Sequence, residues 1–154
     1  MDRGSSASRP RRQWRGLSNL RLFIADDSEL MCSRLAEALI EIGGIEIVGI
    51  AHDAHEAWKS IQLFKPDVAI LDICMPGGSG IDVLKHIRES HYPTKVVIFT
   101  HYPYPQYRKR CMDLGADYFF DKYTDFEKFM AVSVDLAKKH LRSSGLDSAG
   151  GKAR

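Results

Sequence analysis

The sequence predicts an α/β fold in which helices cover both faces of an open, five-stranded parallel sheet. Short apolar runs alternate with segments of helical periodicity five times along the chain, and the connections between them are short. The run Val68–Leu71 is apolar at every position rather than at every second one, as is typical of a central parallel strand. A length of 154 residues with 44% hydrophobic side chains suits one domain with a substantial core.

Five strands are expected where apolar runs end at charged residues, glycine or proline. They are Leu20–Ala25, Ile45–Ala51, Val68–Leu71, Thr94–Thr100 and Asp117–Phe120. Parallel neighbours must be joined by right-handed crossovers, which divide the helices between the two faces of the sheet. The predicted architecture is therefore a doubly wound, three-layer sandwich.

Five helices follow these strands, each marked by a start or stop signal. Ser28 is expected to cap the first helix, which Gly43 and Gly44 end. Asp53 is expected to cap the second helix, which ends before Pro66. The others are expected through Ile81, Leu84 and Ile87, from Pro105 to Gly115, and from Asp125 to about Leu141.

Polar residues gather at the carboxyl ends of four predicted strands. They are Asp26 and Asp27 after the first strand, Asp72 after the third, Thr100 at the end of the fourth, and Lys122 after the fifth. Open parallel sheets bind ligands at this edge, and the flavodoxin-like strand order 2-1-3-4-5 makes these four strands neighbours. Three converging carboxylates repel one another unless a cation neutralises them, which implies a hard divalent ion such as Mg²⁺.

Two segments carry a resemblance to a known family. One is the pattern Asp72-x-x-Met75-Pro76-x-x-x-Gly80, in which the glycine lets another group approach closely. The other is GADYFFDK at residues 115–122, where the aromatic Phe119 precedes the lysine by three residues. Together they resemble bacterial response-regulator receiver domains, and over 20–141 the chain is similar to single-domain receivers of the chemotaxis type.

The resemblance implies a site for phosphoryl transfer that depends on Mg²⁺. Asp72 would accept a phosphoryl group as an aspartyl phosphate, and Asp27 and Asp72 would bind the ion directly. Asp26 would act mainly through water, and the backbone carbonyl of Cys74 would complete the protein's ligands. Such a chain is a phosphoacceptor signalling protein of a two-component system or phosphorelay, and it catalyses only its own phosphoryl transfer and slow autodephosphorylation.

The resemblance also implies a switch. Thr100 and Lys122 would bind phosphoryl oxygens, and an inward movement of Thr100 would open space for the ring of Phe119. The signal would leave through the face made by the fourth helix, fifth strand and fifth helix. Near the start of the fourth helix, the expected partner surface is Tyr102, Tyr104, Tyr107, Arg108 and Lys109. The alternative is a solvated, aromatic-rich loop whose two prolines make it irregular.

The expected partners are a sensor histidine kinase or histidine phosphotransfer protein and a downstream protein target, with a phosphorylation-dependent homodimer as a further candidate. One departure from the family is Tyr123, since many receivers carry a cis proline after the lysine. A cis bond before a residue other than proline costs about 2.5 to 4 kcal/mol, so a trans bond is expected.

The formal charge of +2 hides an uneven distribution. Residues 1–19 carry five Arg against Asp2 and residues 142–154 three bases against Asp147, which leaves 2 − 4 − 2 = −4 for residues 20–141. We expect residues 1–18 and 142–154 to be disordered tails, with no output domain after the receiver. Three dispersed cysteines and the lack of a long apolar run favour a cytoplasmic protein without membrane insertion.

Three alternatives are less well supported by the residues. A haloacid-dehalogenase-type phosphatase needs Asp-x-Asp after its first strand, whereas Asp26 and Asp27 are adjacent. Nucleic-acid binding would rest only on the arginine-rich N-terminal segment, because no helix-turn-helix region follows residue 141. A receiver that only docks to partners is disfavoured because every phosphorylation position is filled. The six histidines are expected at the surface, with His101 the one candidate for contact with the site.

Overall fold

The computed structural model describes the backbone of residues 18–153 and the side chains of residues 18–143. Apart from Ser18, the N-terminal segment expected to be disordered lies outside the described residues. No helix in the described part of the chain is both long enough and apolar enough to span a membrane.

Five parallel strands form the central sheet. Their bounds are β1 Leu20–Ala25, β2 Ile45–Ala51, β3 Val68–Leu71, β6 Lys95–Thr100 and β7 Tyr118–Asp121. They lie in the order β2-β1-β3-β6-β7, and all four neighbouring pairs are parallel. Counted along the chain within this sheet, the order is 2-1-3-4-5, which confirms the prediction. The carboxyl ends of β1, β3, β6 and β7 therefore lie side by side.

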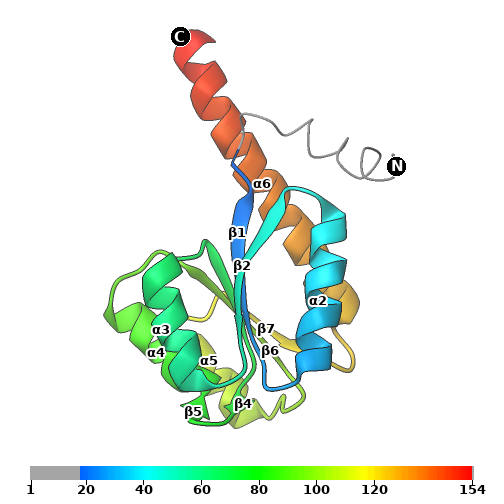
Figure 1. Cartoon of the computed structure of the whole chain (residues 1–154), viewed down its shortest axis with the longest axis vertical. Coiled ribbons are helices and arrows are strands. Elements are labelled where there is room, and N and C mark those ends of the chain that lie inside the picture. Colours follow the sequence, from blue (N-terminus) through cyan, green and yellow to red (C-terminus); the bar gives the residue numbers. More distant parts are fainter. Residues whose placement is uncertain (1–17, 154) are drawn as a thin grey trace, which may run out of the picture.

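Helices cover both faces of this sheet (Figure 1). Their bounds are α2 Glu29–Ile42, α3 Ala54–Phe64, α4 Gly80–Glu89, α5 Pro105–Asp113 and α6 Phe126–Ala153. Figure 1 shows α3, α4 and α5 on one face and α2 and α6 on the other. The expected caps are present, since Ser28 accepts a hydrogen bond from Met31 N at 3.1 Å and Asp53 accepts one from Glu56 N at 2.7 Å.

The core consists of two apolar layers, one on each face of the sheet. Successive side chains of a strand point to opposite faces, so each strand contributes to both layers. In β3, Ala69 and Leu71 pack in one layer, and Val68 and Ile70 pack in the other. This division explains why the strand is apolar at every position.

Two parts of the chain differ from the sequence-based expectation. The last helix was expected to end near Leu141, whereas α6 continues to Ala153 and extends past the sheet (Figure 1). Glycine in the last turns raises the cost of helix formation by about 1 kcal/mol per residue, but no proline blocks propagation there. The loop after β3 also contains a short antiparallel pair, β4 Cys74–Met75 with β5 Gly78–Ser79.

Candidate functional site

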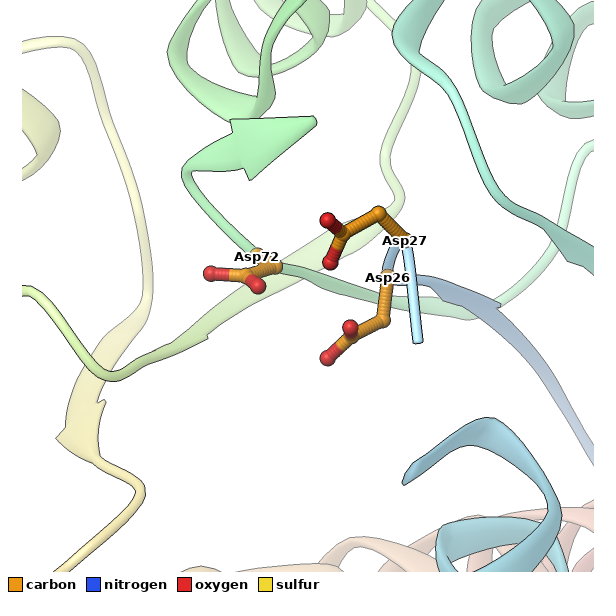
Figure 2. Close-up of side chains that lie close together, drawn as sticks. All are labelled: Asp26, Asp27 and Asp72. Atoms are coloured by element: carbon orange, nitrogen blue, oxygen red, sulfur yellow. The ribbon is translucent and has the colours of Figure 1, made fainter. Parts of the chain in front are cut away.

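Three carboxylates meet at the carboxyl edge of the sheet. Asp26 and Asp27 follow β1 and Asp72 follows β3, and one ligand atom from each lies within 4.8 Å of the others. Figure 2 shows the three side chains gathered in one region. The two strands are neighbours, and the Asp72 amide donates to the carbonyl of Ala25 at 2.9 Å. The sequence therefore predicted correctly which acids meet.

Lys122 enters the same site from the end of β7. Its Nζ donates to Oδ2 of Asp26 and, at 3.0 Å, to Oδ2 of Asp72. Only 3% of the lysine side chain is exposed. The described residues contain no cis peptide bond, so the bond between Lys122 and Tyr123 is trans, as predicted. The substitution of tyrosine for proline does not prevent the lysine from reaching the acids.

Burial and charge act in opposite directions on these groups. Burial raises the pKa of Asp72, and the nearby Asp26 raises it further, against the opposing effects of Lys122 and Thr100. Burial alone would lower the pKa of Lys122, but its bonds to Asp26 and Asp72 outweigh burial and raise it. The lysine therefore remains an ammonium ion at neutral pH and serves as the cation of the acid cluster.

The carboxylates differ in how many of their oxygens are already engaged. Asp26 accepts from Ser28 N at 3.0 Å through Oδ1 and from Lys122 through Oδ2. Asp72 accepts from Ile73 N at 2.7 Å through Oδ1 and from Lys122 at 3.0 Å through Oδ2. Within the described part of the chain, no group donates a hydrogen bond to the exposed carboxylate of Asp27. One carboxylate without a hydrogen bond and two that hydrogen bonds hold in place are a donor set that fits Mg²⁺, which prefers oxygen ligands and retains water.

Thr100 is fully buried at the end of β6. Its Oγ1 accepts a hydrogen bond from Tyr102 N at 3.0 Å, and its hydroxyl also lowers the pKa of Asp72. Thr100 therefore connects the acid cluster to the loop that leads into α5. Cys74 is exposed in the β4–β5 pair, and partial burial together with the charges of Asp72 and Asp27 raises the pKa of its thiol.

Phe119 and Arg108 form a pair near this edge. The Phe119 side chain is already buried, with 5% of its surface exposed. The Arg108 guanidinium lies over the ring, 4.5 Å from its centroid, and Nη1 donates to the carbonyl of Phe119 at 3.4 Å. The sequence indicated neither contact, because nothing in the spacing of α5 and β7 shows that they meet at these residues. Lys109, also on the expected partner surface, pairs with Asp113 at 2.9 Å.

Two histidines differ from the expectation that all six are surface residues. His52 and His140 are half-buried, and Nδ1 of His52 lies 2.9 Å from the carbonyl oxygen of Asp26. The position of His52 in the sequence could have indicated this contact, because His52 directly follows β2 and β2 is the neighbour of β1, which Asp26 and Asp27 follow. His101 stacks on Tyr123 with ring centroids 4.4 Å apart. Tyr123, the residue that stands where many receivers carry proline, therefore packs against the residue that follows Thr100.

Gly80 makes the closest backbone approach in the site. Its amide donates to the carbonyl of Ile73 at 2.9 Å, and a Cβ at this position would lie 2.0 Å from the backbone oxygen of Asp72. Gly80→Ala should therefore displace the loop that holds Asp72 and lower the free energy of unfolding by about 2 to 3 kcal/mol, measured by urea titration. The matched control is Gly49→Ala, whose added methyl meets only side-chain atoms at 3.1 Å or more. Equal stability of the two variants would contradict this prediction.

Comparison with known proteins agrees with this geometry. Residues 22–133 match the family model described as the response regulator receiver domain. The chain belongs to the response regulator receiver family. The structure resembles that of the signal receiver domain of the response regulator NarL from Mycobacterium tuberculosis, with a TM-score of 0.72 and 30% identity over 79% of this chain and 98% of that one. It also resembles a chain of the CheX-CheY-BeF₃-Mg²⁺ complex from Borrelia burgdorferi, with a TM-score of 0.66 and 26% identity over 77% and 96%.

Curated relatives of this receiver are longer proteins. An uncharacterized response regulatory protein from Vibrio cholerae is 34% identical over 80% of this chain and 51% of its own length. A protein-glutamate methylesterase/protein-glutamine glutaminase from Bacillus subtilis is 33% identical over 77% of this chain but only 32% of its own length. The match to each therefore covers at most about half of the relative.

Proposed function

We propose that this receiver accepts a phosphoryl group on Asp72 from a sensor histidine kinase or a histidine phosphotransfer protein. A carboxylate oxygen of Asp72 forms a bond to phosphorus as the bond from phosphorus to the histidine nitrogen breaks, and the imidazole leaves with the electron pair. The observation that carries this proposal is a buried carboxylate with a raised pKa, 3.0 Å from a buried ammonium and beside two further acids.

The acids have a second role in this proposal, as the ligands of a metal ion. Asp27 and Asp72 would bind Mg²⁺ directly, Asp26 would act through water, and the carbonyl of Cys74 would supply a further oxygen. When bound, Mg²⁺ neutralises charge on the phosphoryl oxygens and orients them. The unengaged carboxylate of Asp27 supports this assignment, because it can bind an ion without losing a hydrogen bond.

Lys122 and Thr100 would bind the phosphoryl oxygens. Lys122 is already within hydrogen-bonding distance of Asp72, and phosphoryl transfer depends mainly on such positioning and on charge neutralisation. The test is intact-mass spectrometry of the chain after incubation with a small acyl phosphate. A phosphoryl adduct is expected with Mg²⁺ and not with EDTA, and equal labelling in EDTA would reject the metal assignment.

The switch is proposed to run through the hydroxyl of Thr100. Phe119 is already buried, so its inward movement is not required from this conformation. Thr100 Oγ1 accepts from Tyr102 N, so turning the hydroxyl toward a phosphoryl oxygen changes that bond and displaces Tyr102. Tyr102, Tyr104 and Tyr107 form a series of ring contacts, with centroids 6.5 and 5.7 Å apart, through which the displacement can reach α5.

NMR with beryllofluoride and Mg²⁺, which mimic the phosphorylated state, tests this switch. We expect amide shifts at Asp27 and Asp72 and also along residues 102–113 and at Phe119. The control is Thr100→Val, which keeps the shape but removes the hydroxyl, and there the shifts in 102–113 should be lost. Shifts confined in the wild type to the loops that hold Asp27, Asp72 and Thr100 would contradict the switch.

The signal is proposed to reach a downstream protein through the face made by α5, β7 and α6, in the cytoplasm. Tyr102 and Tyr104 are 41% and 52% exposed on this face, and aromatic residues are enriched among binding hot spots. A phosphorylation-dependent homodimer would use the same kind of surface. The methylesterase activity named for the Bacillus subtilis relative belongs to that longer protein and is not proposed for this domain.

A further inference from the structure

The acid cluster depends on a residue outside it. We infer that His52 is a positioning residue for the metal ligands: its hydrogen bond to the Asp26 carbonyl fixes the peptide group from which the Asp27 side chain projects. His52 does not belong to the pattern of acids, hydroxyl and lysine from which the site was recognised. The inference rests on the proposed Mg²⁺ site and adds a residue that holds that site in shape.

The contact itself defines the state of the histidine ring. Nδ1 of His52 lies 2.9 Å from the backbone oxygen of Asp26. Because a carbonyl oxygen can only accept a hydrogen bond, Nδ1 must carry the hydrogen. The thiol of Cys32 donates to the same oxygen at 3.5 Å. The Asp26 carbonyl is thus held by two side chains at a point where no sheet ladder continues.

The backbone of Asp26 is attached at both ends to the end of β2. Its amide donates to the carbonyl of Ala51 at 3.1 Å, and its carbonyl accepts from the next residue, His52. A peptide group is planar, so fixing its oxygen fixes the plane that also contains the Cα atom of Asp27. The imidazole therefore helps to fix the position of the Cα atom from which the Asp27 side chain projects.

Asp27 needs this support more than the other two acids do. Ser28 N and Lys122 hold the carboxylate of Asp26, and Ile73 N and Lys122 hold that of Asp72. In the part of the chain described by the structure, no comparable hydrogen bond holds the Asp27 carboxylate. Its place within 4.8 Å of the other ligand atoms thus depends on the backbone beneath it.

The test compares three substitutions at this position by isothermal titration of the full chain with MgCl₂. His52→Ala removes the donor and should weaken Mg²⁺ affinity about 10-fold, the usual effect of losing a group that orients a metal ligand. In His52→Asn the amide nitrogen is bonded to Cγ, as Nδ1 is, so the donor is retained and affinity should stay within about threefold of the wild type. His52→Gln places its nitrogen one bond further out and should resemble His52→Ala.

A control and a metal-free measurement separate positioning from stability. His55→Ala, an exposed histidine on α3, should leave affinity unchanged. Without metal, the NMR amide signals of Asp27 and Ser28 should shift in His52→Ala and stay near their wild-type positions in His52→Asn. Wild-type affinity in His52→Ala, or an asparagine variant as weak as the alanine variant, would overturn the inference. A wild-type chain that binds no Mg²⁺ would instead reject the proposed function, and the metal-free signals would still decide the role of His52.

Discussion

Asp72→Asn is expected to abolish phosphorylation of the chain while making the metal-free protein more stable. Loss of labelling follows from removing the only oxygen nucleophile that the proposal uses, since an amide oxygen does not form the acyl phosphate. Intact-mass spectrometry after incubation with a small acyl phosphate and Mg²⁺ measures it. Asp135→Asn on α6, whose carboxylate pairs with Lys139 at the surface, is the matched control and should be labelled like the wild type.

The gain in stability follows from the direction of the pKa shift. Burial raises the pKa of Asp72 above its ordinary value of 3.8, so the folded state binds this proton more tightly than the unfolded state does. The free energy of unfolding therefore falls as the pH rises from about 3.8 through the raised pKa. Asparagine does not ionise, so the Asp72→Asn variant avoids this decrease in the free energy of unfolding. The urea midpoint of the variant at pH 7 should therefore exceed that of the wild type. A lower midpoint would mean that the Lys122 bond outweighs burial.

Lys122→Met is expected to lower the free energy of unfolding by about 3 kcal/mol at neutral pH without metal. The substitution leaves Asp26 and Asp72 buried, with 3% and 5% of their surfaces exposed, and removes the ammonium that both contact. Labelling of Asp72 should also slow by about 100-fold, because a preorganised group for the phosphoryl oxygens is lost. Urea titration and timed mass spectrometry give the two quantities.

The pH dependence and a control variant make this prediction specific. The pKa of Lys122 is raised above 10.5, so its contribution to stability is complete below that pH and disappears as the pH rises through the folded-state pKa. This alkaline loss should be missing in Lys122→Met. Lys128→Met, whose lysine is 76% exposed, should change stability by less than about 0.5 kcal/mol. If the two variants are equally stable, Lys122 does not neutralise the cluster.

The sheet and the edge that carries the site could be predicted because both depend on local patterns. An apolar run such as Val68–Leu71 identifies a buried strand wherever it packs, and parallel strands bring their carboxyl ends to one edge. The caps at Ser28 and Asp53 are equally local, since each hydroxyl or carboxylate bonds an amide three residues further on. The convergence of Asp26, Asp27 and Asp72 could be predicted from the strand pattern and the parallel arrangement together, because each acid directly follows a strand whose carboxyl end lies at that edge.

The contacts that could not be predicted join residues far apart in the sequence. Lys122 bonds Asp26 across 96 positions, and His52 bonds the same residue's carbonyl across 26. Strand order brings such residues to one edge but leaves rotamers and donor directions undetermined. The cation–π pair of Arg108 and Phe119 likewise depends on how α5 lies over β7. The contacts of Lys122 in particular determine the electrostatics of the site.

The central claim is that Asp72 is the phosphoacceptor of this receiver, and the measurement that tests it most directly is peptide mapping of the phosphorylated chain. The chain is labelled with a small acyl phosphate and Mg²⁺, digested under mild acidic conditions and sequenced by tandem mass spectrometry. We expect the phosphoryl group on Asp72 alone, with no labelled peptide when EDTA replaces Mg²⁺. A label on another residue, or one that forms equally well without the metal, would contradict the claim.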